Sequence, residues 1–182
     1  LCETLREKQK RGSLLWVLDK TKTAMGARTL RNYIEQPLLN KADMEARLDA
    51  VEELSKDSVS RDEIREYLNP IYDLERLLSK VTYKTANPRD LIAFRNSLEM
   101  LPHIKTVLKG FTKELLTGIY DDMESLEDIY ALIDAAIEEE PPLLVREGGI
   151  IKDGFNEDID MLRNAKRDGK QWLAQLEEED RE

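Results

Sequence analysis

The stretch Asn87–Leu91, which reads Asn-Pro-Arg-Asp-Leu, begins a strongly marked helix. Asn is a favourable N-cap, Pro suits the first helical position, and an acid in the first turn complements the helix dipole. Apolar residues then recur at helical spacing at Leu91, Phe94, Leu98 and Leu101. Pro102 falls inside this pattern and predicts a kink or a break, because proline cannot donate the internal hydrogen bond.

Similar signals on both sides predict a mostly helical chain. The first predicted helix follows Ser13 as its N-cap, the second covers Thr23–Gln36, and the third follows Asn40 as its N-cap. Further helices are predicted over Ser60–Leu68, Ile71–Tyr83 and Met123–Ile137. Pro37 ends the second helix, since proline disfavours helical geometry in the residue before it. In the third, apolar residues at spacings of three and four predict a core-facing stripe: Met44, Leu48, Val51 and Leu54.

One segment is predicted to be β-structure. Two short runs rich in Leu, Val and Ile, residues 143–147 and 150–153, flank Gly148-Gly149. Such runs joined by two glycines are typical of a β-hairpin. An anion-binding nest of backbone N–H groups at the glycines is the less favoured alternative. Gly154 then turns the chain into a final helix with Asn156 as its N-cap.

The final helix carries apolar residues at heptad-like spacing and no Gly, Asn or Pro that would end it. Roughly 27 residues at about 1.5 Å each extend about 40 Å, longer than packing in a small domain requires. We therefore expect a projecting helix that needs a partner helix, and a chain that is a piece of a longer protein. The exposed pairing candidates are Ile159, Leu162, Trp172, Leu173 and Leu176. The predicted fold class is mostly α: a multi-helical core with one short β-hairpin and a long projecting C-terminal helix.

The charge of the chain is uneven. Net charge is −10 overall, with +3 in residues 1–118 and −13 in residues 119–182. The acidic part would repel a phosphate backbone. The stretch Arg6–Arg31 has eight basic and two acidic residues. A solvated face is favoured there over nucleic-acid contact. We predict that the isolated chain binds duplex DNA weakly or not at all.

The residues for common catalytic sites are scarce. The chain has one histidine, His103, and one cysteine, Cys2, which excludes a disulfide framework and nearly excludes a His/Cys metal site. It contains no P-loop pattern and no apolar run long enough to span a membrane. The residues alone therefore predict a helical, acidic, cytoplasmic protein with no catalytic, cofactor or metal site of its own.

Three stretches closely resemble signatures of the DNA mismatch repair protein family MutS, and the bacterial branch is the most similar. The first runs from Leu18 to Leu38, the second joins Asp73–Leu77 to Pro88–Leu91, and the third runs from Pro141 to Asn156. Their order and spacing also match the family, and together they span nearly the whole chain.

The resemblance implies a position in a larger protein. Residues 1–155 would be part of the helical core or lever domain, and residues 156–182 would begin the long helix to the clamp that closes over DNA. The lever would couple an ATPase domain to that clamp. The resemblance implies that ATP and Mg²⁺ act in the absent ATPase domain. It also implies mismatched duplex DNA, a MutL-type protein and a second copy of the full-length protein as partners.

The resemblance also suggests coupling residues within the family-like motifs. The charged candidates for ion pairs between helices are Arg28, Asp73, Arg76, Arg89 and Asp90, and the structural candidates are Pro37, Gly148, Gly149 and Gly154. The alternative is that each charged residue caps or solvates its own helix. Two other functions stay open: a helical protein–protein adaptor, and the core of a MutS paralogue acting outside mismatch correction. A self-contained enzyme is disfavoured because a catalytic set is missing.

Overall fold

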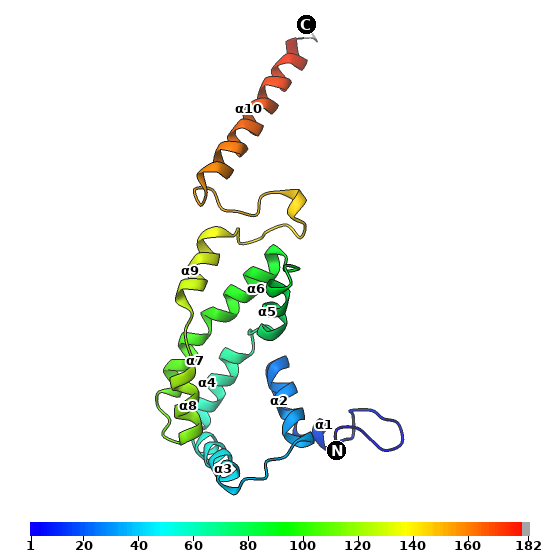
Figure 1. The fold of residues 1–182 in the computed structure, drawn as a ribbon, viewed down its shortest axis with the longest axis vertical. Helices are drawn as coiled ribbons and strands as arrows, with labels where there is room; N and C mark the ends of the chain where they lie inside the picture. Colours follow the sequence, from blue (N-terminus) through cyan, green and yellow to red (C-terminus); the bar gives the residue numbers. More distant parts are fainter. Residues whose placement is uncertain (180–182) are drawn as a thin grey trace.

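The computed structural model describes the backbone of residues 1–179 and the side chains of residues 1–170. Within these residues the fold is mostly helical and elongated (Figure 1). The helices are α1 (Leu14–Leu18), α2 (Ala24–Glu35), α3 (Lys41–Lys56), α4 (Ser58–Leu68), α5 (Leu74–Thr82), α6 (Pro88–Glu99), α7 (Leu101–Leu108), α8 (Glu114–Asp122), α9 (Glu127–Ala136), the 3-10 helix η1 (Val145–Glu147) and α10 (Glu157–Glu179). Among the described residues, none of the helices has both the length and the apolar character of a membrane span.

Side-chain caps set most of the helix starts. Ser13 and Asn40 accept hydrogen bonds from backbone N–H groups in the first turns of α1 and α3, as predicted. Asn87 forms a reciprocal capping box with Asp90 at the start of α6. Asp57 starts α4 two residues earlier than predicted, and Asp73 starts α5 three residues later than predicted. The α2 helix ends at Glu35, shortly before Pro37.

Two hydrophobic clusters hold the helices together. The first lies among α3, α4, α7 and α8 and contains Ala50, Ile71, Ile104, Leu108, Phe111 and Leu116. The second lies between α6 and α9 and contains Ile133, Ala136 and Ile137, with Leu91, Ile92, Phe94, Ile129, Ile150 and Ile151 packed against it. The α6 helix contacts α5, α7 and α9, so it links the two clusters.

The region around Pro102 breaks as expected. The α6 helix ends at Glu99, and α7 begins at Leu101 with Pro102 in its first turn, where the missing N–H costs little. The α8 helix was not predicted. The α9 helix begins at Glu127 instead of Met123, after Leu126 adopts a left-handed conformation with φ of 50°.

The predicted core-facing stripe of α3 is wrong. Leu48 and Val51 are 66% and 58% exposed, Met44 is 38% exposed, and only Leu54 of the four packs against the first cluster. The α3 helix lies at one end of the body and packs on α4 and α8 (Figure 1). Its buried face is instead centred on Ala50, whose small side chain lets the neighbouring helices approach.

The predicted β-hairpin is also wrong. Residues 145–147 form the 3-10 helix, which the Glu147 carboxylate closes by accepting a hydrogen bond from the Leu144 N–H at 3.1 Å. Ile151 pairs with Ile137 in an isolated antiparallel bridge. This pairing places Ile150 and Ile151 against the second cluster, where they bury apolar surface that a free hairpin would leave in water.

The last helix begins one residue after the predicted cap. Asn156 Oδ1 accepts a hydrogen bond from the Ile159 N–H at 3.1 Å. The α10 helix then runs from Glu157 to Glu179 and points away from the other helices (Figure 1).

Candidate functional site: charged contacts between the helices

The candidate coupling residue Arg28 joins α2 to the start of α5. Its guanidinium donates to both carboxylate oxygens of Asp73, at 2.7 and 2.8 Å, and also bonds Glu75. Asp73 additionally caps α5 by accepting from the Arg76 N–H. The hydrogen bond from Arg28 is the main reason that the pKa of Asp73 lies below its usual value. One carboxylate therefore both starts α5 and ties it to α2.

Asp90 has a similar double role at the start of α6. Its carboxylate accepts a hydrogen bond from the Asn87 N–H and forms an ion pair with Lys80 of α5, whose Nζ lies 2.7 Å away. Burial pushes the pKa of Asp90 upward, but these two donors outweigh burial and lower the pKa. Asp90 thus completes the capping box of α6 and ties α5 to the start of α6.

The other two charged candidates behave differently. Arg89 Nε donates to the backbone carbonyl of Pro141 at 3.0 Å, which ties α6 to the segment after α9 by a hydrogen bond. Arg76 is exposed, and its side chain makes no ion pair with any side chain in residues 1–170. Of the five charged candidates, Arg28, Asp73 and Asp90 form ion pairs with another helix or its cap.

The sequence reasoning missed the ion pairs of Arg95, the most buried charged residue among residues 1–170. Arg95 of α6 is only 7% exposed, and its guanidinium forks onto both oxygens of Glu139 at 2.6 and 2.7 Å. It also donates to Asp134 of α9 at 2.8 Å. Lys152 completes the set, 3.6 Å from Glu139 and 4.0 Å from Asp134. We call these four residues, Arg95, Asp134, Glu139 and Lys152, the Arg95 cluster.

A sequence signal for the Arg95 cluster exists. Arg95 lies four residues after Leu91 and three before Leu98, on the apolar face of α6. A charge at such a position requires a buried partner. The hydrogen bond from Arg95 is the main cause that lowers the pKa of Glu139 to about 2, and it raises the pKa of Arg95 in turn.

Charged contacts also hold the base of α10. Arg163 donates to the Ile151 carbonyl and to the Asp153 carboxylate, both at 2.5 Å. The Asp160 carboxylate accepts from the Gly154 N–H at 2.8 Å. Gly154 has a φ of 84°, which favours glycine. These contacts join the first turns of α10 to the segment on the other side of Gly154.

Gly148, Gly149 and Leu162 lie at exposed positions. Gly148 and Gly149 have φ of 73° and 67°, and a Cβ at either would meet nothing within 4 Å. Leu162 is 70% exposed, whereas Ile159 is half-buried. The side chains of Trp172, Leu173 and Leu176 lie outside the described residues.

The basic stretch Arg6–Arg31 is partly neutralised. Lys10 pairs with Asp19, Arg28 pairs with Asp73 and Glu75, and Arg31 pairs with Glu35 in its own helix. The hydrogen bond from Lys10 is the main reason that the pKa of Asp19 falls to about 2. Fewer free cations are therefore available for a phosphate backbone than the sequence suggests.

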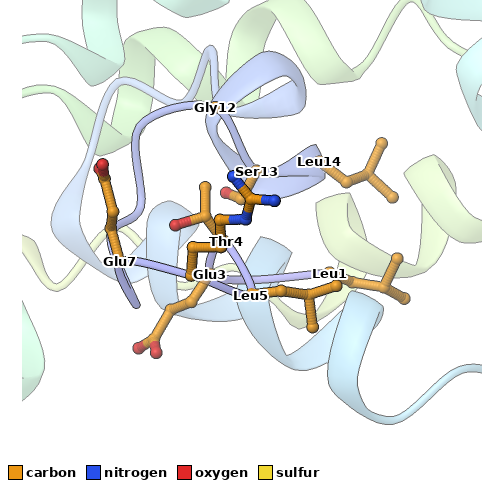
Figure 2. Close-up of a pocket in the computed structure, with 9 residues that line it drawn as sticks. Leu1, Glu3, Thr4, Leu5, Glu7, Gly12, Ser13 and Leu14 are labelled. Atoms are coloured by element: carbon orange, nitrogen blue, oxygen red, sulfur yellow. The ribbon is translucent and has the colours of Figure 1, made fainter.

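The described residues do not gather the side chains of a metal site. They contain no group of three or more His, Cys, Asp and Glu side chains placed to hold a metal ion. His103 stacks on Tyr67 with ring centroids 5.2 Å apart, which is a packing role. A hollow of about 490 Å³ is lined by residues between Leu1 and Leu14 (Figure 2), but Leu1 and Leu5 at its wall are 77% and 101% exposed. Such an open hollow does not exclude water as an active site does.

Comparison with known proteins identifies the family. The profile of MutS domain III matches residues 1–182. DNA mismatch repair protein MutS of Lachnoclostridium phytofermentans is 60% identical over 182 residues, and those of Acetivibrio thermocellus and Ruminiclostridium cellulolyticum are 51% and 52% identical. The match covers 100% of this chain in each case, and 20%, 21% and 21% of the relatives, so the chain spans about a fifth of their length. The chain belongs to the MutS family of DNA mismatch repair proteins, in which it corresponds to domain III.

Proposed function

We propose that this chain is the central lever of a MutS-type mismatch repair protein. The lever couples ATP binding and hydrolysis in an ATPase domain outside this chain to the grip of a clamp on mismatched duplex DNA. The first 155 residues form the lever, and α10 begins the helix that leads to the clamp. The full-length protein acts in the cytoplasm as a homodimer and passes its signal to a MutL-type protein.

One observation carries the proposal: a continuous series of contacts from the helical body to α10. Arg95 of α6 binds Glu139, which follows α9. Next, the Glu138 N–H donates to the Ile150 carbonyl at 2.8 Å, beside the bridge of Ile137 and Ile151. Arg163 of α10 then binds the Ile151 carbonyl. A displacement of α6 therefore has a direct mechanical route to α10.

The physical basis of the lever is discrete repacking. Close-packed helices shift between alternative arrangements and do not deform smoothly. In this chain two hydrophobic clusters make the body stiff, and charged contacts join its parts. Directional contacts such as the fork of Arg95 on Glu139 resist rotation more than apolar contacts do.

ATP and Mg²⁺ belong outside this chain in the proposal. The sequence carries no P-loop pattern, and the described residues offer no group of acids placed for a metal. No catalytic step is therefore assigned to these residues. The isolated chain is expected to bind duplex DNA weakly or not at all, given the net charge of −13 in its second part.

The test uses the full-length protein with Arg95→Met, which removes the charged link and keeps an unbranched side chain. We expect heteroduplex binding and ATP hydrolysis to persist, while ATP-stimulated release from mismatched DNA slows. Arg61→Met is the matched control, because the half-buried Arg61 side chain forms its ion pair among residues 1–170 with the neighbouring Asp62 of its own helix. Release by Arg95→Met at the rate of the unmodified protein would refute the lever.

The adaptor hypothesis has one supporting observation. Met161 and Leu162 of α10 are 64% and 70% exposed, as expected for a helix that binds another helix. If the chain is an adaptor, Leu162→Glu abolishes capture of a separate partner protein and leaves ATP-stimulated release unchanged. A MutS paralogue outside mismatch correction would show the coupling without a preference for heteroduplex over homoduplex.

A further inference from the structure

We propose that Arg163 is a positioning residue that sets the direction in which α10 leaves the body, by locking a hinge at Gly154. The geometric part of this inference stands alone, and its consequence for DNA release rests on the proposed function. Three features of the base of α10 support it: a glycine hinge, a side chain that spans the hinge, and an anchored contact point on the far side.

Gly154 is the hinge. Its φ of 84° lies where L side chains are strained, so the chain turns sharply just before α10. A Cβ at this position would meet nothing within 4 Å, so no group packs against that side of the Gly154 Cα, and the turn is held by hydrogen bonds such as that from the Gly154 N–H to Asp160. Phe155, the next residue, is 43% exposed. The direction of α10 is therefore not fixed by packing around the turn.

Packing along α10 gives little further restraint. Among residues 157–170, whose side chains are described, most are exposed, and only Ile159, Asp160 and Arg163 are half-buried. All three lie in the first two turns, next to the hinge. Whatever holds the described part of α10 in position must act at this end.

Arg163 spans the hinge. One terminal nitrogen donates to the Ile151 carbonyl, and the other donates to Asp153, twelve and ten residues earlier. The second nitrogen also lies 3.7 Å from Asp160 on α10 itself. A planar guanidinium that meets two groups at once fixes an orientation, whereas a single ammonium would leave rotation free.

The anchor on the far side is part of the body. Lys152 N–H donates to the Ala136 carbonyl at 2.8 Å, and Lys152 Nζ donates to the Asp134 carbonyl at 2.7 Å. Ile151 is paired with Ile137 and packs against the second cluster. Arg163 consequently holds α10 to a segment that α9 already fixes.

The experiment measures geometry in the full-length protein without nucleotide. Spin labels at two exposed positions, Glu99 on α6 and Asp168 on α10, report the distribution of distances between body and helix. Arg163→Gln is expected to broaden this distribution, and Arg163→Lys is expected to give an intermediate width. Arg167→Gln is the control and should leave it unchanged, because among the described side chains Arg167 bonds only Asn164 in its own helix.

Hydrogen exchange gives a second readout of the same lock. In Arg163→Gln, amides of residues 151–156 should lose protection by about tenfold, the factor expected for one charged hydrogen bond. Amides of α4 and α7 should keep theirs, which shows that the variant is folded. A distance distribution in Arg163→Gln as narrow as that of the unmodified protein would overturn the inference.

The two proposals fail separately. If Arg163→Gln broadens the distribution and ATP-stimulated release is unchanged, the hinge lock stands and the lever fails. If the distribution stays narrow, the hinge lock fails whatever the release rate. Broadening together with slower release supports both.

Discussion

Arg95 should show a specific asymmetry in the stability of the chain. Its side chain is 9% exposed, whereas those of Asp134 and Glu139 are 45% and 61% exposed. Removing the arginine returns two acids to water and leaves Lys152 nearby to balance them. Removing the acids instead leaves a guanidinium buried, with Asn96 Oδ1 as its remaining side-chain acceptor. We therefore predict that Arg95→Met is much less harmful than Asp134→Ala/Glu139→Ala.

The magnitude follows from the burial of Arg95. Stranding a fully buried charge costs about 3–5 kcal/mol, and replacing a buried pair by apolar groups is often neutral. The acids of the Arg95 cluster face solvent, so water can reach part of the unpaired guanidinium once they are removed. We therefore reduce the expected loss of stability to about 2–3 kcal/mol. Arg95→Met should stay within about 1 kcal/mol of the unmodified chain. For a chain of this size, 2–3 kcal/mol corresponds to a fall of roughly 4–12 °C in Tm.

Urea unfolding followed by circular dichroism measures both variants. The triple variant Arg95→Met/Asp134→Ala/Glu139→Ala completes the cycle, and it should be more stable than the variant that lacks the acids alone. The reasoning is refuted if Arg95→Met costs as much as the loss of both acids, because the cost would then lie in lost packing.

Two further predictions concern carboxylates in tertiary contacts. Glu53→Ala should fray the start of α8 and speed amide exchange at residues 112–116, because Glu53 accepts hydrogen bonds from the Thr112 and Lys113 N–H groups at 2.9 and 3.0 Å. The control Glu52→Ala loses only a pair with Lys56 in its own helix and should leave exchange at residues 112–116 unchanged. Stability should fall as pH drops from 4.5 toward about 2, because the folded pKa of Glu139 is lowered to about 2 and the unfolded chain therefore binds the proton at a higher pH than the folded chain. Arg95→Met should flatten this part of a plot of urea midpoint against pH. An unchanged slope would contradict the assignment of the lowered pKa to Arg95.

Features that depend on a short stretch of sequence were predicted well. Ser13, Asn40 and Asn87 were predicted as N-caps because a cap depends on residues one turn apart, and each caps as expected. The break at Pro102 also follows from local chain geometry. Such features can be predicted because no distant part of the chain has to be known.

The α8 helix was missed because its cap is not local. No side chain of its own caps it, and Glu53, about sixty residues earlier, supplies the acceptor from α3. The carboxylate also favours the positive end of the helix dipole. A sequence pattern within one segment cannot reveal a cap that only the packing of α3 against α8 provides.

The hairpin failed for a related reason. Two glycines between β-prone runs favour a turn, and both do adopt a positive φ. The choice of pairing partner, however, depends on which contact buries more apolar surface. Ile151 reaches Ile137 and the second cluster, whereas Leu143, Leu144 and Val145 are 52%, 44% and 72% exposed. The local turn was predictable, but the partner was set by tertiary burial.

The candidate coupling residues divide along the same line. Of the charged candidates in the family-like motifs, Arg28, Asp73 and Asp90 lie in contacts between helices, and their role in coupling stays a prediction. Arg95 lay outside that selection, although its place on the apolar face of α6 marked it. A charge on a buried helical face is expensive unless a partner meets it, so it is a stronger sign of a distant contact than a charge on an exposed face.

The arrangement of these contacts bears on how the proposed lever could be stiff and still switch. Apolar clusters fill the body, and ion pairs and hydrogen bonds add directional contacts between α5 and α6, between α6 and the segment after α9, and between that segment and α10. Each joint has a few directional contacts, so it breaks or holds as a unit. Exposed carboxylates such as Glu139 and Asp153 can return to water when a joint opens, which keeps the open state within reach. A joint made only of buried apolar contacts would expose apolar surface to water on opening, and it would therefore hold α10 in one position.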